Sequence, residues 1–356
     1  MKINTRKLIM ASLVLIAAGA VLMGVGYLFG GRAGVAFSRE GVISPYGDQN
    51  AYMMKKTKID PFSDAEIKIE SYADIRIRPS GDDHFYAEYK LDGYYSEPVC
   101  QVRDDTLVVT HTGKPRQYGV MVNFFSFGVQ DELQNAGLTL YIPKGKEMGR
   151  LDVRNDSGDL SIEGIAFEDG KLKVSYGGTE LQNVSFQDLE LDMESGNLDM
   201  EDVTAENLVL KNEYGNVTLK KTSFQKAEAE LESGRLRADD FTCGTLSAQA
   251  DYGDIDLDDA SLETAEFVLE SGNLDLDAGK LTDLTCKSDY GNVNIRLPED
   301  VSEYSINARS EYGSINIPDS ASGHRFTEDD ESVYVSEGKT KGTITIKVES
   351  GDIDIR

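Results

Sequence analysis

The chain has 356 residues, of which 40% are hydrophobic and 28% are charged, and its formal net charge is −27 at pH 7. This composition excludes a disordered or collagen-like chain and allows a folded domain with a sizeable core. All the acids lie beyond residue 39. Such an acidic chain repels phosphate, which argues against nucleic-acid binding and favours cations or basic partners.

The segment Leu8–Gly31 contains no charged residue, and a helix needs about 20 apolar residues to cross a bilayer. We therefore expect residues 1–31 to form a cytoplasmic N-terminus and a transmembrane anchor, with residues 32–56 as a juxtamembrane linker. A cleaved signal peptide is the alternative. Three basic residues among the first seven favour an N-terminus inside the cell, which predicts a single-pass protein with an extracytoplasmic C-terminal domain.

A Ser-Gly or Tyr-Gly pair recurs through the second half of the chain. Eight of these glycines are spaced by 19 residues, and two more follow after 22 and 38 residues: Gly158, Gly177, Gly196, Gly215, Gly234, Gly253, Gly272, Gly291, Gly313 and Gly351. A unit this short cannot bury an apolar side alone, so successive units must stack.

Within each unit, apolar residues alternate with the period of a β-strand. The phase of the alternation changes near the glycine, five to six residues after it, and ten to twelve residues after it. Each change implies a corner. We predict an all-β fold, a parallel β-solenoid (β-helix) of 19-residue rungs with three faces. A chain of antiparallel hairpins is the alternative, and it would need a second strong turn signal in each unit.

The same alignment places the domain boundaries. Residues 151–356 form the predicted solenoid, and residues 57–150 form an irregular β capping region with an insertion at 114–137. Ala73 stands in the glycine column of a degenerate first unit. Near the other end, Pro318–Lys341 replaces one unit with a polar loop before the pattern returns.

The residue before each glycine alternates between Ser and Tyr. Because its parity matches that of the core, we expect these side chains to point inward, each tyrosine using the room left by a serine above and below it. A Ser233→Tyr substitution is then expected to destabilise the coil by roughly 1 to 3 kcal/mol. Cys243 and Cys286 fall in apolar columns and are expected to be buried and unreactive.

The column two residues before the glycine is mostly acidic and points outward. One hypothesis is a cation ladder that binds Ca²⁺, formed by Glu194, Glu213, Glu232, Asp251, Glu270 and Asp289. The alternative, which we favour, is a solvated acidic edge that limits association. The nine-residue repeat of calcium β-rolls is absent, and the three histidines and three cysteines show no ligand spacing.

No motif of nucleophilic, metalloprotease or nucleotide chemistry occurs, so no catalytic or cofactor-binding residue is assigned. A catalytic cleft on a solenoid needs protruding loops, and the eight evenly spaced glycines leave no insertion for one. The chain is therefore not expected to be an enzyme. A glycan-acting β-helix lyase or hydrolase is the alternative.

The early "SYADIRIRPS", the "LTLYIPKG" strand and the repeated "SGDL", "YGNV" and "SGNL" units resemble a bacterial β-strand-repeat family of unknown function, the "putative adhesins". That family includes LiaG-like and YvlB-like envelope proteins. The resemblance covers residues 57–356 and implies a non-enzymatic binding or envelope-stress accessory module attached to the membrane. It implies a protein of the envelope or a glycan as partner, and it carries over no catalytic residue.

Overall fold

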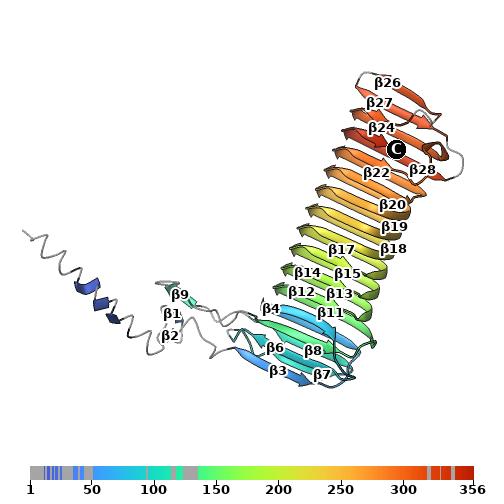
Figure 1. Cartoon of the computed structure of the whole chain (residues 1–356). Coiled ribbons are helices and arrows are strands. Elements are labelled where there is room, and N and C mark those ends of the chain that lie inside the picture. Colours follow the sequence, from blue (N-terminus) through green and yellow to red (C-terminus); the bar gives the residue numbers. More distant parts are fainter. Residues whose placement is uncertain are drawn as a thin grey trace, which may run out of the picture.

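The computed structural model describes residues 51–93, 95–113, 118–122, 135–318, 322–328, 330–337 and 341–356, together with separate positions between 12 and 43. The described chain is almost entirely β, as predicted, and its main sheet winds into a long stack of rungs (Figure 1). A separate small sheet contains β1 (Val35–Ser38), β2 (Gly41–Ile43) and β9 (Tyr118–Val122).

The first rungs of the stack are built from long and short strands in turn, and three later rungs each contain one strand of 17 residues. The first half comprises β11 (Glu147–Ser157), β12 (Leu160–Glu163), β13 (Ala166–Tyr176), β14 (Thr179–Gln182), β15 (Ser185–Ser195), β16 (Leu198–Glu201) and β17 (Thr204–Tyr214). The second half comprises β18 (Val217–Ser233), β19 (Leu236–Tyr252), β20 (Ile255–Ser271), β21 (Leu274–Lys280), β22 (Asp283–Tyr290) and β23 (Val293–Arg296). Neighbouring rungs pair in parallel, and partners such as Leu189 and Leu208 are one repeat apart.

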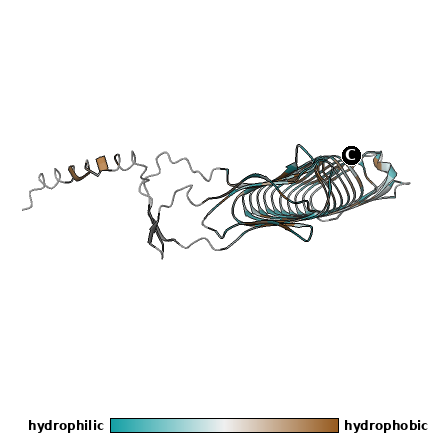
Figure 2. Cartoon of the chain, turned by 90° about the horizontal axis from the view of Figure 1, so that it is seen from below, coloured by the Kyte–Doolittle hydropathy of each residue, from teal (hydrophilic) through white to brown (hydrophobic). Residues whose placement is uncertain are grey.

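The core runs through the centre of the coil, which is flattened when seen toward its end (Figure 2). In the rung at β15, Phe186, Leu189 and Leu191 are buried, whereas the two residues between Phe186 and Leu189 are both exposed. The burial pattern changes phase there and also near the glycine. A third change lies six residues after the glycine, where Asp202 has a φ of 54°. The predicted apolar columns are confirmed at all three places.

The glycine column is required by close approach between rungs as well as by its φ angles. Gly234 has a φ of +133°, and a Cβ on it would lie 1.9 Å from the carbonyl oxygen of Gly215 on the rung before. At Gly253 the corresponding distance to the oxygen of Gly234 is 1.6 Å. Any side chain in this column would therefore collide with backbone. The sequence indicated the turn but not this contact.

Cys243 and Cys286 are buried in the core, as predicted. Burial raises the pKa of the Cys243 thiol to about 11 and that of Cys286 to about 12. The Cys243 thiol also donates to the carbonyl of Thr245 at 3.2 Å. Both thiols are therefore protonated at neutral pH, which makes them poor nucleophiles.

The C-terminal end of the stack corrects the expectation that the rungs follow sequence order. After a 3-10 turn (Val301–Glu303) the chain forms β24 (Tyr304–Tyr312), β25 (Ile315–Asn316), β26 (His324–Glu328), β27 (Glu331–Ser336), β28 (Gly342–Ser350) and β29 (Ile353–Ile355). β28 pairs in parallel with both β22 and β24, so the last segment of the chain inserts between two earlier rungs. Most of the expected polar loop is a hairpin, in which β27 covers the outer side of β24.

The N-terminal end of the stack is closed by β3 (Tyr52–Lys58), β4 (Asp64–Tyr72), β5 (Asp74–Pro79), β6 (Tyr86–Leu91), β7 (Val99–Arg103), β8 (Thr106–His111) and β10 (Gly137–Ile142). β4 joins β11 in parallel, with a register shift that places Tyr72 beside Ser157. Most of the predicted insertion at 114–137 lies outside the described residues.

Most of the predicted transmembrane segment also lies outside the described residues, which include only some of its positions in helical form. Within the residues that the structure describes, no helix is both long enough and apolar enough to cross a membrane. Leu15 and Leu22, two of the apolar residues that are described there, are each 72% exposed.

Candidate interaction surface

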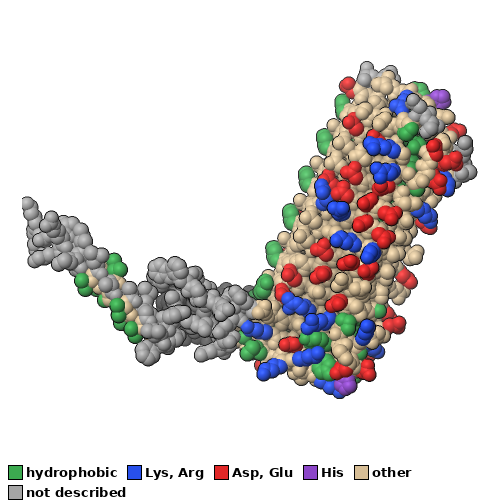
Figure 3. Space-filling view, viewed as in Figure 1, with side chains coloured by type: hydrophobic (Ala, Val, Ile, Leu, Met, Phe, Trp, Pro, Cys, Tyr) green, Lys and Arg blue, Asp and Glu red, His purple; other side chains and the backbone are tan. Residues whose placement is uncertain are grey.

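The Ser/Tyr column points outward, so the predicted inward packing is wrong. Six tyrosines in this column are 55% to 65% exposed: Tyr72, Tyr176, Tyr214, Tyr252, Tyr290 and Tyr312. The alternation of buried and exposed side chains ends one residue earlier than the sequence pattern suggests. The residues one and two places before the glycine both lie on the outside of the corner. Figure 3 shows hydrophobic side chains at regular intervals along one edge of the stack.

Serine and tyrosine alternate strictly in space. Cross-rung contacts give the order Tyr72, Ser157, Tyr176, Ser195, Tyr214, Ser233, Tyr252, Ser271, Tyr290, Ser350 and Tyr312. We call this column the tyrosine edge. Because adjacent strands lie about 4.8 Å apart, neighbouring tyrosines are separated by about 10 Å. None of the six phenol groups has a hydrogen-bond partner among the described residues.

A ladder of Asn and Asp side chains holds the corner beside the tyrosine edge. The side-chain oxygen of Asn216 accepts the backbone N–H of Arg235 at 3.1 Å, and that of Asn273 accepts the N–H of Asn292 at 2.9 Å. The acceptor atoms of this ladder therefore bind the backbone of the next rung. These bonds fix the rung spacing, and with it the spacing of the tyrosines.

The acid column runs alongside the tyrosine edge. It contains the six predicted ladder residues, Glu194, Glu213, Glu232, Asp251, Glu270 and Asp289, and the stack continues it with Glu349 and Glu311. Only Glu194 and Glu311 have a lysine within 4 Å among the described residues. The other six carboxylates carry unneutralised charge beside the exposed rings.

Some acids in other columns are neutralised by a basic residue on a neighbouring rung. Lys171 binds Glu190 at 2.7 Å, and Lys211 binds Glu230 at the same distance, each from a neighbouring rung. Arg235 contacts Asp254 at 2.8 Å, which lowers the pKa of that carboxyl through the hydrogen bond between them.

The described residues include no group of three His, Cys, Asp or Glu side chains that could hold a metal ion. The acids of the column stand one per rung along a line, so they do not converge on a common point. Calcium binding by Glu194 and its five partners therefore stays a prediction without a formed ligand set.

The family model for Toastrack DUF4097 matches residues 65–258 and 186–356, which together include more than half of the chain. The chain belongs to this family. No curated protein matches it in sequence.

Several solved structures are similar to this member of the Toastrack DUF4097 family. A "putative adhesin" from Parabacteroides distasonis is 14% identical with a TM-score of 0.46, and the match covers 70% of this chain and 98% of that one. A "putative adhesin" from Parabacteroides merdae is 16% identical with a TM-score of 0.45, over 70% and 98% of the two chains. A "putative lipid binding protein" from Parabacteroides distasonis is 13% identical with a TM-score of 0.42, over 87% and 98%.

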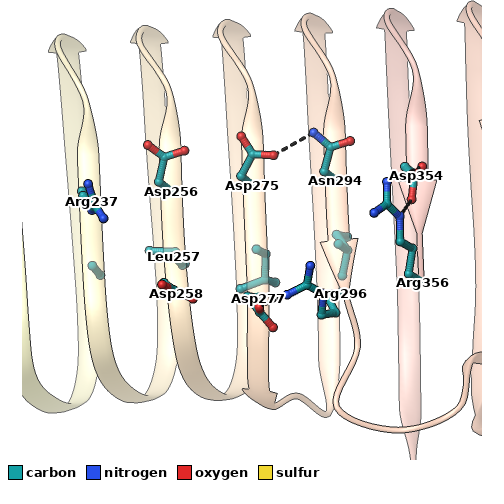
Figure 4. A pocket seen from close by; sticks show the side chains of 13 residues that line it. Arg237, Asp256, Leu257, Asp258, Asp275, Asp277, Asn294, Arg296, Asp354 and Arg356 are labelled. Atoms are coloured by element: carbon teal, nitrogen blue, oxygen red, sulfur yellow. Dashed lines mark hydrogen bonds and ion pairs between the residues drawn. The ribbon is translucent and has the colours of Figure 1, made fainter.

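A shallow groove near the C-terminal end of this Toastrack DUF4097 member contains several acidic side chains. Four of its carboxylates, those of Asp256, Asp258, Asp275 and Asp277, stand on two neighbouring rungs, with Arg237 on the rung before and Arg296 on the rung after (Figure 4). Burial raises the pKa of Asp256, although Arg235 lies 3.2 Å from it. Asn294 donates to Asp275 at 2.7 Å, and Arg296 pairs with Asp277. The groove contains acids, but most of them are bound to the protein's own side chains.

The sequence signal for the tyrosine edge was visible as the alternation of Ser and Tyr. Its direction could not be found from parity, because the corner begins before the glycine. The sequence pattern already placed Tyr72, Ser350 and Tyr312 in this column. Their spatial order could not be found, since it depends on which rungs become neighbours.

Proposed function

We propose that the chain is a non-enzymatic binding protein of the cell envelope, which displays the tyrosine edge to an extended partner. The observation that carries this proposal is the spatial alternation of exposed tyrosines, maintained where the chain order of the rungs is broken. Exposed aromatic side chains in a contiguous array are typical of interaction sites. Hydrogen bonds between rungs make the array rigid, which reduces the entropy lost on binding.

The proposal includes an N-terminal membrane anchor with the solenoid outside the cell. The uncharged run Leu8–Gly31 supports the anchor, as do the exposed apolar side chains described within it. The acidic solenoid would be repelled by anionic lipid headgroups, so it is expected to extend away from the bilayer. Carbonate extraction of membranes, combined with protease treatment of intact protoplasts, tests this arrangement. A protein released by carbonate, or protected from the protease, would contradict it.

A glycan-cleaving enzyme is the weaker alternative. Asp256 and Asp275 stand on neighbouring rungs, as a pair of catalytic carboxylates could. However, Arg235 and Asn294 already bind them, and the groove lies on an open face. The tyrosine edge offers no comparable internal partners for its rings and acids, so binding is the better supported activity.

Sedimentation with protein-free bacterial cell-wall sacculi tests the binding function. The full chain in detergent micelles is expected to sediment with sacculi. A variant with Tyr214→Ser, Tyr252→Ser and Tyr290→Ser is expected to remain in the supernatant. The control carries Met53→Ser, Val209→Ser and Phe326→Ser, which remove exposed apolar side chains elsewhere. Equal sedimentation of the tyrosine variant and the control, or no sedimentation of the wild type, would contradict the proposal.

A further inference from the structure

We infer that the tyrosine edge binds a linear, amino-bearing polysaccharide of β-1,4-linked hexosamine residues. This inference rests on the proposed binding function and names the chemical class of its ligand. It starts from the two periods of the surface. The acid column supplies one carboxylate per rung, and the tyrosine edge supplies one exposed ring per two rungs.

The period of the tyrosines requires a ligand that is extended and repetitive. Rings about 10 Å apart cannot contact one small molecule together. In an extended β-1,4-linked chain each sugar is turned over relative to the one before, so the same ring face returns once per disaccharide. One sugar spans about one rung, and a disaccharide spans about two. The disaccharide repeat of the ligand therefore has about the same length as the spacing between neighbouring tyrosines.

The chemistry of the rings suits this ligand. A tyrosine face is negatively polarised and attracts both polarised C–H groups and cations. A pyranose ring presents a face of C–H groups, and its hydroxyls can bond to the phenol groups, which have no other partner among the described residues. The intervening serines, such as Ser233 and Ser271, are small and partly exposed, so they leave space between the rings for the alternate sugar.

The acid column favours a ligand with positive charge. Six of its eight carboxylates make no ion pair with a described residue, so a polyanion would be repelled and an amine would be attracted. A hexosamine chain with free amino groups carries one amine per sugar, and because each sugar is turned over relative to the one before, one ammonium per disaccharide faces the acid column. The surface thus pairs two carboxylates and one ring with each disaccharide.

Basic peptides match the surface less well. An extended β-strand advances about 3.3 Å per residue, so its side chains lose register with the rungs. A polyproline II helix repeats at about 9.3 Å, close to the tyrosine spacing. It presents one charged side chain per turn to the edge, as the polysaccharide presents one ammonium per disaccharide, but it lacks the face of C–H groups with which a pyranose ring covers each tyrosine ring.

Calorimetric titration of the full chain in detergent micelles with defined oligomers tests the inference. The probes are the β-1,4-linked glucosamine hexamer, its shorter homologues, the N-acetylated hexamer, an oligogalacturonate and a Pro-Pro-Arg repeat peptide. We expect the glucosamine hexamer to bind most tightly, with affinity that rises with length and falls with salt. The triple tyrosine variant should bind it about a hundredfold more weakly.

Two further variants separate register and charge from overall composition. Tyr252→Ser combined with Ser271→Tyr keeps the number of tyrosines but breaks their period, and should weaken hexamer binding about tenfold. Glu213→Gln with Asp251→Asn and Asp289→Asn should remove the preference for free amines over N-acetyl groups. Circular dichroism melting confirms that each variant is folded.

The outcomes distinguish a wrong ligand class from a wrong binding function. Equal binding of the N-acetylated hexamer, tighter binding of the Pro-Pro-Arg peptide, or unchanged affinity in the register variant would overturn the inference. If no oligomer binds but sacculi still sediment with the wild type and not with the tyrosine variant, the ligand class is wrong and the binding function stands. If both assays are negative, both proposals fail.

Discussion

Tyr290 lies beside Ser350 on the adjacent parallel strand, although 60 residues separate them in the sequence. The other side of Ser350 faces Tyr312. The last strands of the chain thus complete an internal rung, and the rung formed earlier in the chain closes the stack. The order of serine and tyrosine remains regular across this break.

Removal of residues 342–356 is therefore expected to release the C-terminal end of the stack. β24 would lose its parallel partner β28, through which it is joined to β22. Because each rung contacts only its neighbours, the earlier rungs should stay folded. Limited proteolysis should cleave the truncated chain between residues 301 and 337 and leave β11–β20 intact. Global proteolysis at the same protease concentration would contradict nearest-neighbour stability.

A Gly234→Ala substitution should destabilise the solenoid by about 2 to 4 kcal/mol, because the new Cβ collides with the carbonyl oxygen of Gly215. Gly81→Ala is the control, since nothing lies within 4 Å of a Cβ at that position. Urea unfolding followed by circular dichroism measures both free energies. Equal stabilities for the two variants would show that the rungs can separate at low cost.

Loss of one acceptor from the Asn ladder should have a smaller effect. Asn216→Ala leaves the backbone N–H of Arg235 without its side-chain acceptor and should cost about 1 kcal/mol. Asn207→Ala is the matched control, because the amide of Asn207 bonds only to the exposed side chain of Asp188. The same urea titration should place the control within about 0.5 kcal/mol of the wild type. If Asn207→Ala lowered the free energy of unfolding as much as Asn216→Ala, the ladder bonds would contribute no more to stability than an exposed side-chain contact.

The outward direction of the tyrosine edge reverses the expectation for Ser233→Tyr. Ser233 is partly exposed, so the larger side chain can extend into solvent instead of entering the core. The free energy of unfolding should change by no more than about 0.5 kcal/mol. A loss of 1 to 3 kcal/mol, as core overpacking would produce, would show that this column packs inward after all.

Reaction of the cysteines with iodoacetamide should depend on folding. Burial raises the pKa of Cys243 to about 11 and that of Cys286 to about 12, so at pH 8 both are protonated in the native state. In the unfolded chain a thiol has a pKa of about 8.5 and reacts readily. These raised values stabilise the fold below pH 8.5, and their contribution is lost as pH rises toward 11. Mass spectrometry should find both residues modified in urea only, and native labelling would contradict the burial.

The sequence determined most of the rung. Apolar residues at a period of two, with three phase changes around each glycine, specify which residues enter the core, because a side chain on a strand can face only one of two sides. The positions of Cys243 and Cys286 followed from the same pattern. A fixed repeat of 19 also predicted the parallel pairing, since such a unit can bury its apolar side only against a copy of itself.

Only the tertiary structure decided the direction of the tyrosines and the order of the last rungs, because both depend on contacts between rungs. Whether Tyr214 points inward depends on where the backbone begins to turn, and the close approach of Gly215 and Gly234 across the rungs shapes that turn. The place of Ser350 between Tyr290 and Tyr312 depends on which strands become neighbours, because the end segments share the same alternating pattern and local sequence does not distinguish their partners. The tyrosine edge is continuous only because the stack joins segments that the chain keeps apart.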